Sequence, residues 1–148
     1  MFQLSTLWYS GSWEDDLKQG QGVQTYANSD EYSGSWDNGK RNGEGVLTSA
    51  NGDVYSGDWK DDFKQGQGVQ TYANGDKYSG LWDNGKRNGE GVFTSASGDV
   101  YSGPWKDDFR HGEAQCLENL ENRSIGLDNF STDPYCKAKN SFERVQQP

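Results

Sequence analysis

The sequence predicts an all-β protein, an elongated single-layer antiparallel β-meander built from tandem hairpin repeats of 23 residues. A Tyr-x-Gly-x-Trp motif first appears at Tyr9 and recurs at this spacing without insertion. Large and small residues alternate within the motif, as expected of a strand. Asn-Gly pairs, which favour the positive φ angles of a tight hairpin turn, follow it. This constant period indicates that one short supersecondary unit is stacked along the chain.

Residues 32–54 illustrate the predicted unit of two strands and two turns. Tyr32 and Trp36 fall on one face of the first strand. The returning strand contains Gly43 and Gly45, and glycine weakens a strand unless something large approaches closely. We therefore expect rings to lie across these glycines, with the tryptophans forming a buried ladder. The predicted core residues are Tyr9, Trp13, Tyr32, Trp36, Tyr55, Trp59, Tyr78, Trp82, Tyr101, Trp105, Gly22, Gly45, Gly68 and Gly91.

The pattern divides the chain into three regions. Residues 1–8 align with the end of a returning strand and are predicted to form an N-terminal edge strand. The repeat array spans residues 9–112, and Pro104 and Ala114 mark the decay of its last unit. Residues 113–148 are predicted to form a capping tail. The units of the array begin at residues 9, 32, 55, 78 and 101.

Within the tail, residues 133–146 are predicted to form a short C-terminal helix. Pro134 suits the first helical position, because the amide that proline lacks would be unpaired there. Tyr135, Ala138 and Phe142 follow at helical spacing on one face. Such a short helix is marginal alone, so we expect it to cover the open end or a face of the sheet.

A longer period of two units lies on top of the shorter one. Residues 9–54 match residues 55–100 much more closely than neighbouring units match each other. Odd units have an Asp-Asp turn followed by Leu or Phe, whereas even units have an Asn-Gly turn followed by Lys. The bulky residue of the returning strand also shifts by one pleat between odd and even units, which predicts that neighbours interlock.

Composition and charge exclude several function classes. Only 30% of the residues are hydrophobic, so burial must come largely from the aromatic residues, which make up 14% of the chain. The net charge of −9 argues against nucleic-acid binding and against simple adhesion to anionic lipids. Residues 1–7 lack the features of a signal peptide, and no window is long and apolar enough to span a bilayer. Cys116 and Cys136 are therefore expected to be free thiols in a cytoplasmic, non-secreted protein.

No pattern predicts an enzyme. The Gly-x-Gly pairs lack the third glycine and the following helix of a dinucleotide-binding fingerprint. Paired acids such as Asp61 and Asp62 are expected to be solvated turn residues, because alternating oxygen ligands for calcium are missing. His111 takes the place of Gln19 and Gln65 in the repeat. We expect no catalytic residue, cofactor, metal site or small-molecule substrate.

The repeat, with Gly-Lys-Arg-x-Gly-x-Gly-Val after its aromatic head, resembles the MORN (membrane occupation and recognition nexus) family from Tyr9 to Gly112. Odd units depart from the family pattern by lacking the turn glycine. The resemblance implies a twisted, grooved sheet used for protein interaction and oligomerisation, and a lipid-binding role is also implied. It further implies a cytoskeletal, axonemal (cilium) or membrane-peripheral location. In the second unit the family positions are Tyr32, Gly34, Trp36, Gly39, Lys40, Gly43, Gly45 and Gly52.

The expected function is that of a non-enzymatic scaffold or adaptor that binds an extended or helical protein segment or forms a homodimer. Leu17, Phe63 and Phe109 recur at the tips of odd hairpins, where an apolar group in water suggests a contact site. A competing interpretation is that each tip folds back over its own tryptophan. The Asp pairs at the rim are expected to select basic partner flanks. The predicted partner-binding residues are Leu17, Phe63, Phe109, Tyr26, Tyr72, Leu47 and Phe93.

Two alternative functions remain at the level of sequence. The first is a phospholipid- or membrane-binding module. The second is a glycan- or choline-binding repeat module, because rows of aromatic rings on a sheet can stack on such ligands. The missing signal peptide counts against the second alternative, since such modules act outside the cell.

Overall fold

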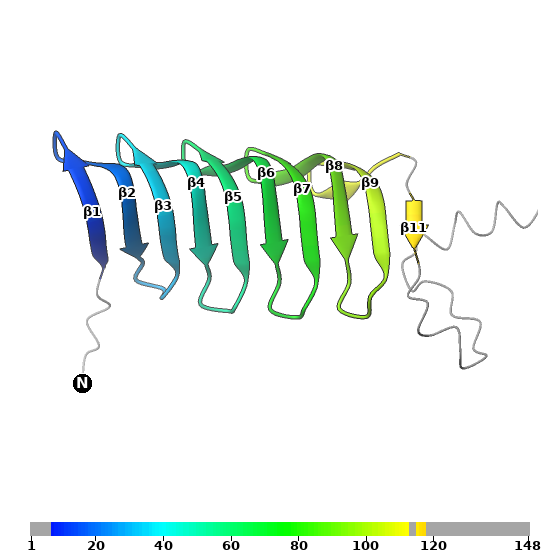
Figure 1. The fold of residues 1–148 in the computed structure, drawn as a ribbon. Helices are drawn as coiled ribbons and strands as arrows, with labels where there is room; N and C mark the ends of the chain where they lie inside the picture. The colour runs from blue at the N-terminus through cyan, green and yellow to red at the C-terminus, as the bar shows by residue number, and fades with distance from the viewer. Residues whose placement is uncertain (1–6, 113–114, 118–148) are drawn as a thin grey trace, which may run out of the picture.

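The computed structural model describes residues 7–112 and 115–117, and these form one open antiparallel sheet (Figure 1). From β1 to β10, each strand pairs with the next in sequence, and β11 pairs with β9. The strands are β1 (Trp8–Glu14), β2 (Leu17–Thr25), β3 (Glu31–Asp37), β4 (Lys40–Thr48), β5 (Val54–Lys60), β6 (Phe63–Thr71), β7 (Lys77–Asp83), β8 (Lys86–Thr94), β9 (Val100–Lys106), β10 (Phe109–Arg110) and β11 (Gln115–Leu117). No helix occurs in these described ranges. The predicted single-layer meander is confirmed.

The ends of the chain are described only in part. Residues 1–6 of the predicted N-terminal edge strand and the predicted helix 133–146 lie outside the described residues, and Trp8 opens β1. At the other end, β10 and β11 both pair with β9, so they represent the returning strand of the fifth unit with an interruption. The long returning strand of the earlier units is thus replaced here by the two short strands β10 and β11.

The hairpin turns explain how odd units manage without the turn glycine. In an even unit, Asn38 and Gly39 have φ angles of 49° and 81°. In the next odd unit, Asp61 and Asp62 adopt 47° and 72°, so both kinds of turn place two residues in the left-handed region. Asp tolerates this conformation better than most residues. The odd and even turns thus share one backbone geometry despite their different sequences.

The core is a single row of rings that lie on glycines. The Tyr32 ring occupies the space that a Cβ at Gly34 or Gly45 would need. Its hydroxyl donates to the Ser35 carbonyl at 3.0 Å. The Tyr ring meets the Trp36 ring edge to face at a centroid distance of 5.1 Å. The third and fourth units repeat this arrangement with Tyr55 and Tyr78, so these units bury their tyrosines against their own glycines.

The tryptophans occupy a different place from the one expected over the glycines. The tyrosines cover the glycines, whereas the Trp59 indole donates to the Gly45 carbonyl of the preceding unit at 3.2 Å. Trp59 also meets the Tyr32 ring at 5.3 Å, so each tryptophan joins two units. The fully buried rings are Tyr32, Trp36, Tyr55, Trp59, Tyr78, Trp82, Tyr101 and Trp105.

The prediction that Trp13 is buried is wrong, because 58% of it is exposed. In later units the tryptophan is covered by a tyrosine and a glycine carbonyl from the unit before. Among the described residues no unit precedes Trp13, and the one ring that it meets there is that of Tyr9 in its own unit, at 5.0 Å. Burial of the ladder thus requires a neighbour on the N-terminal side.

Replacement of tryptophan by alanine is expected to cost very different amounts along the sheet. Trp59→Ala removes a buried ring that joins two units and should lower the free energy of unfolding by about 3–5 kcal/mol. Trp13→Ala removes a half-exposed ring at the first unit and should cost clearly less. Urea titrations followed by circular dichroism would measure both values, and equal losses would contradict the nearest-neighbour core.

Candidate functional site

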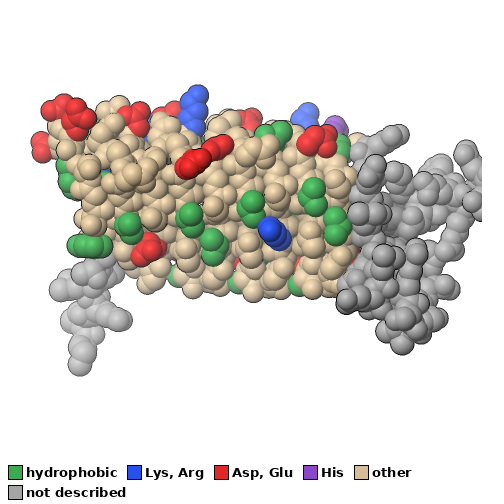
Figure 2. All heavy atoms as spheres, in the orientation of Figure 1, with side chains coloured by type: hydrophobic (Ala, Val, Ile, Leu, Met, Phe, Trp, Pro, Cys, Tyr) green, Lys and Arg blue, Asp and Glu red, His purple; other side chains and the backbone are tan. Residues whose placement is uncertain are grey.

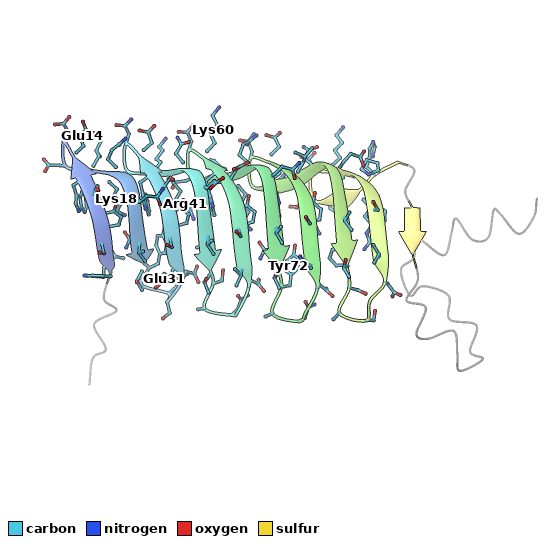
Figure 3. The ribbon with its side chains drawn as sticks, in the orientation of Figure 1. Glu14, Lys18, Glu31, Arg41, Lys60 and Tyr72 are labelled. Carbon is cyan, nitrogen blue, oxygen red and sulfur yellow. The ribbon has the colours of Figure 1, made fainter. Side chains whose placement is uncertain are left out.

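One face of the sheet bears all the buried rings and is called the ring face here. Figure 2 displays one side of the sheet, on which hydrophobic side chains are scattered singly. Acidic side chains lie along the upper border in this view. That border holds the tips of the hairpins, and Figure 3 has Glu14 and Lys60 projecting from it. Lys18 and Arg41 lie further in, over the sheet (Figure 3). The ring face therefore has cations as well as rings.

A row of cations, one from each unit, covers the rings. Lys64 illustrates it: the Nζ atom lies 4.6 Å from the Tyr55 ring centroid and 4.7 Å from that of Trp82 in the next unit. Such contacts favour a positive charge over an aromatic face. The long side chains also shield the rings from water, since a single-layer sheet has no second layer to do so. The five members are Lys18, Arg41, Lys64, Arg87 and Arg110.

This row of cations was not predicted, although the alternation along the returning strand indicates it. The alternation that put Gly43, Gly45 and Leu47 on one face also puts Arg41 there when it is extended two residues back. Only the adjoining Lys40, at the turn, was named among the positions that match the MORN family. Lys40 proves to be an exposed tip residue whose Nζ lies 3.9 Å from Asp61.

In even units the cation is an arginine held by a carboxylate of the next hairpin. The Arg87 Nε atom lies 3.2 Å from Asp108 Oδ1, and another guanidinium nitrogen donates to the Asp108 carbonyl at 2.8 Å. The Arg87 backbone amide donates to the same carboxylate oxygen at 2.9 Å. Arg41 and Asp62 repeat these contacts. The second Asp of each such turn is therefore an internal counterion as well as a partly solvated acid.

In the first and third units the cation is a lysine held by a glutamine. The Lys64 Nζ atom donates to Gln70 Oε1 at 2.6 Å, and Lys18 donates to Gln24 in the same way. Within the described ranges, neither lysine has a carboxylate at ion-pair distance. Burial lowers the pKa of Lys64 to about 8, although Asp108 and Asp53 act in the opposite direction. Burial also lowers the pKa of Lys18.

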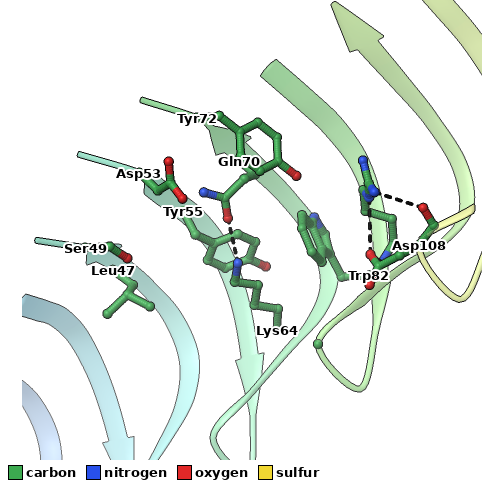
Figure 4. Close-up of a pocket in the computed structure, with 11 residues that line it drawn as sticks. Leu47, Ser49, Asp53, Tyr55, Lys64, Gln70, Tyr72, Trp82 and Asp108 are labelled. Carbon is green, nitrogen blue, oxygen red and sulfur yellow. Dashed lines mark hydrogen bonds and ion pairs between the residues drawn. The ribbon is translucent and has the colours of Figure 1, made fainter. Parts of the chain in front are cut away.

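The ring face is hollowed around Lys64 (Figure 4). The hollow has a volume of about 340 Å³. Its apolar wall comes from two residues expected to bind a partner, Leu47 and Tyr72, together with Tyr55 and Trp82 of the core. The remaining lining is polar or charged and consists of Ser49, Asp53, Lys64, Gln70, Gly85, Arg87 and Asp108. The hollow is therefore more polar than apolar, with an apolar wall on which a partner side chain could pack.

The other residues expected to bind a partner are distributed over neighbouring positions. Tyr26 and Leu47 line a second hollow of about 410 Å³ nearer the N-terminus. Phe93 is partly buried and lies 6.3 Å from the Trp105 ring, beneath Arg110 at 5.3 Å. Two hollows and one covered ring thus occupy the ring face.

The apolar tips lie beside the hollows rather than in them. Leu17, Phe63 and Phe109 are 43%, 53% and 77% exposed. Phe63 lies near Gly85 of the next hairpin, where an added Cβ would be 3.7 Å from its ring. Leu17 stands in the same relation to Gly39, at 3.5 Å. The closest neighbour of these tips is therefore the next turn, and they form a border separate from the hollows.

Other kinds of site find no support within the described residues. No group of three His, Cys, Asp or Glu side chains there is arranged to hold a metal ion. No helix in that part of the chain is long and apolar enough to cross a membrane.

Comparison with known proteins identifies the repeat. A family model described as MORN repeat matches residues 9–31, 32–54, 55–77, 78–100 and 101–117. The matches are consecutive and begin at the five positions where the Tyr-x-Gly-x-Trp motif begins. No curated protein matched the chain.

The lowered pKa of Lys64 predicts a change of stability with pH. Because the pKa is about 8 in the folded state and 10.5 when unperturbed, the unfolded chain binds more protons between these values. The contribution of Lys64 to the free energy of unfolding is complete above pH 10.5. It is lost as the pH falls to about 8. Raising the pH from about 7 to about 9.5 should therefore raise the melting temperature of the parent relative to a Lys64→Met variant.

Circular dichroism melts of both proteins at the two pH values would test this. The range ends below pH 10 because burial raises the pKa of Tyr32 and Tyr78 from 10.0 to about 12. Above pH 10 the unfolded chain loses these protons before the folded protein does, so both tyrosines reduce stability there. Identical shifts in parent and variant would show that Lys64 is not the group responsible.

Proposed function

Since the chain belongs to the MORN repeat family, whose repeats serve protein or membrane interaction, we propose that it is a scaffold or adaptor module that binds a partner protein on its ring face. The family is generally non-enzymatic, which supports a binding role rather than a catalytic one. We further propose, on the family alone, a cytoplasmic location at a cytoskeletal structure or a membrane periphery.

The hollow around Lys64 is the observation that carries this proposal. Its volume of about 340 Å³ falls within the range of roughly 300–1,000 Å³ found for binding pockets. Leu47 and Tyr72 offer apolar surface at its wall, and both are packed against the buried rings. A wall that is already ordered loses little entropy when a partner binds.

The repeating geometry favours a linear partner. The two hollows lie on one face of a sheet whose units follow each other in sequence order. An extended or helical segment can place successive side chains along such a row. A second copy of this chain is one candidate for the partner, and its binding would make a homodimer.

The tip border supports a secondary contact. Phe109 is the most exposed of the large hydrophobic side chains, and Phe63 is half exposed. We propose that these tips extend the binding surface beyond the hollows, because exposed apolar rows are typical of interaction sites.

A capture experiment separates the hollow from the tips. Immobilised parent protein is compared with a Tyr72→Ser variant, a Leu17→Ser/Phe63→Ser/Phe109→Ser variant and a Val46→Ser/Val92→Ser control. The control changes two exposed residues on strand positions that face away from the rings. Captured proteins are identified by mass spectrometry, and light scattering gives the mass of each variant.

Loss of a captured protein with Tyr72→Ser, together with an unchanged control, is the expected result. Additional loss with the triple variant would assign the tips to the same interface. Retention in every variant would contradict the proposal. Flotation of the parent with phosphatidylserine vesicles, in the absence of any captured protein, would favour the membrane-binding alternative.

A further inference from the structure

We propose that the hollow around Lys64 accepts a carboxylate of the partner, so that the ring face selects an acidic protein segment with apolar flanks. The inference rests on the proposed function, since it names the chemistry of the partner. It reverses the selection of basic flanks expected from the Asp pairs. Three observations lead to it, and they concern the counterions, the turn glycine and the spacing of the lysines.

Three members of the Asp pairs already contact cations within the protein. Asp62 and Asp108 are held by Arg41 and Arg87 of the hairpin before. Asp61 lies 3.9 Å from the Lys40 ammonium. These acids have cations of their own, so they have little capacity left to recruit basic residues of a partner.

Lys64 differs because, among the described residues, no carboxylate lies at ion-pair distance from it, although Asp53 and Asp108 line the same hollow. An ammonium group has three donors, and the described contacts of Lys64 include one hydrogen bond, to Gln70. The rings of Tyr55 and Trp82 also contact the ammonium group but accept no ordinary hydrogen bond from it. A charge that is partly removed from water gains strongly from an oppositely charged hydrogen-bond partner. A carboxylate entering the hollow supplies that partner.

The turn of the next hairpin explains why the counterion is missing. Gly85 in that turn takes the repeat position that Asp108 takes one unit later, 23 residues further on. Asp108 closes over Arg87, whereas Gly85 has no side chain and lines the open hollow. The φ angles of the two residues are alike, at 83° and 72°. Glycine at this position therefore both opens the hollow and leaves Lys64 without a carboxylate.

A protein side chain fits this site better than a lipid headgroup. Asp53 and Asp108 line the hollow beside Lys64, and the chain has a net charge of −9. A broad anionic membrane surface would meet these acids together with the lysine. A single Asp or Glu side chain can reach the ammonium while its apolar neighbours contact Leu47 and Tyr72.

The spacing of the lysines constrains the partner further. Lys18 repeats the arrangement, over the Tyr9 and Trp36 rings, with Gly39 in the place of Gly85. Lys18 lies on β2 and Lys64 on β6, so four strand spacings of about 4.8 Å separate them by about 19 Å. This distance corresponds to about six residues of extended chain or about thirteen residues of helix. The partner is expected to have acidic residues at one of these intervals.

The test selects peptides without assuming a natural partner. A display library of random peptides about twenty residues long is selected on the full-length parent protein, and the enriched peptides are synthesised. Dissociation constants are then measured by fluorescence anisotropy for the parent and for four variants. The variants are Lys64→Met, the control Lys86→Met, and the pair Gly85→Asp and Gly85→Asn.

The two glycine variants separate charge from size. Asp at position 85 supplies an internal carboxylate in a backbone conformation that Asp108 already adopts. Asn fills nearly the same space without charge and also tolerates positive φ. Lys86 is exposed at a hairpin tip, so its replacement removes the same charge away from the hollow. Melting temperatures establish that each variant is folded.

The selection is expected to enrich acidic peptides. Their dissociation constants for Lys64→Met and Gly85→Asp should be at least about tenfold higher than for the parent, because one charged hydrogen bond is lost. Lys86→Met should bind like the parent, and Gly85→Asn should bind better than Gly85→Asp.

Four outcomes would overturn the inference. Enrichment of basic or neutral peptides, or equal losses for Gly85→Asn and Gly85→Asp, would reject a carboxylate site and leave the proposed protein binding intact. No enriched peptide would count against both. Vesicles of phosphatidylcholine and phosphatidylserine that bind the parent and not Lys64→Met would assign the lysine to a membrane instead.

Discussion

The contact between a tyrosine ring and two glycines is the interaction on which the structure depends. Tyr55 covers Gly57 and Gly68, and its ring edge meets the tryptophans of its own unit and the next. A methyl group at either glycine would displace the ring, so the repeat has little freedom at these positions. Because each tryptophan then joins its unit to the tyrosine and glycine of the unit before, the sheet grows in one dimension and needs no second layer.

In a single-layer sheet one side of the rings would face water, and the row of cations covers that side. Lys64 and Arg87 lie over rings with long apolar stems and positive heads. The residues that shield the core are therefore the same residues that line the hollow. Stability and binding capacity share one set of side chains, so a substitution in the hollow must be judged by melting as well as by affinity.

The sequence was sufficient for the strands, turns and buried tyrosines, because period-two alternation and a fixed repeat encode them locally. It was insufficient for the tryptophans. A bulge between Gly34 and Trp36 shifts the register, so on β4 Trp36 lies opposite Arg41 rather than Gly43. The hollow was also not predictable, because it depends on which side chains of adjacent hairpins meet. Leu47 and Tyr72 were found by their bulk, whereas Lys64 was missed because the two rings that it covers lie on the neighbouring strands.

The two-unit period of the sequence has one physical origin in the turns. An Asp in the left-handed region is strained relative to Gly, and its hydrogen bonds to the preceding Arg offset that strain. The exchange of Gly for Asp therefore goes together with the exchange of Lys for Arg one hairpin earlier. Where the turn has Gly39 or Gly85, the lysine before it keeps a charge without a carboxylate. Within the described residues, the turn sequence thus determines which cations of the ring face lack a carboxylate at ion-pair distance, and the 46-residue period becomes the spacing of the lysines.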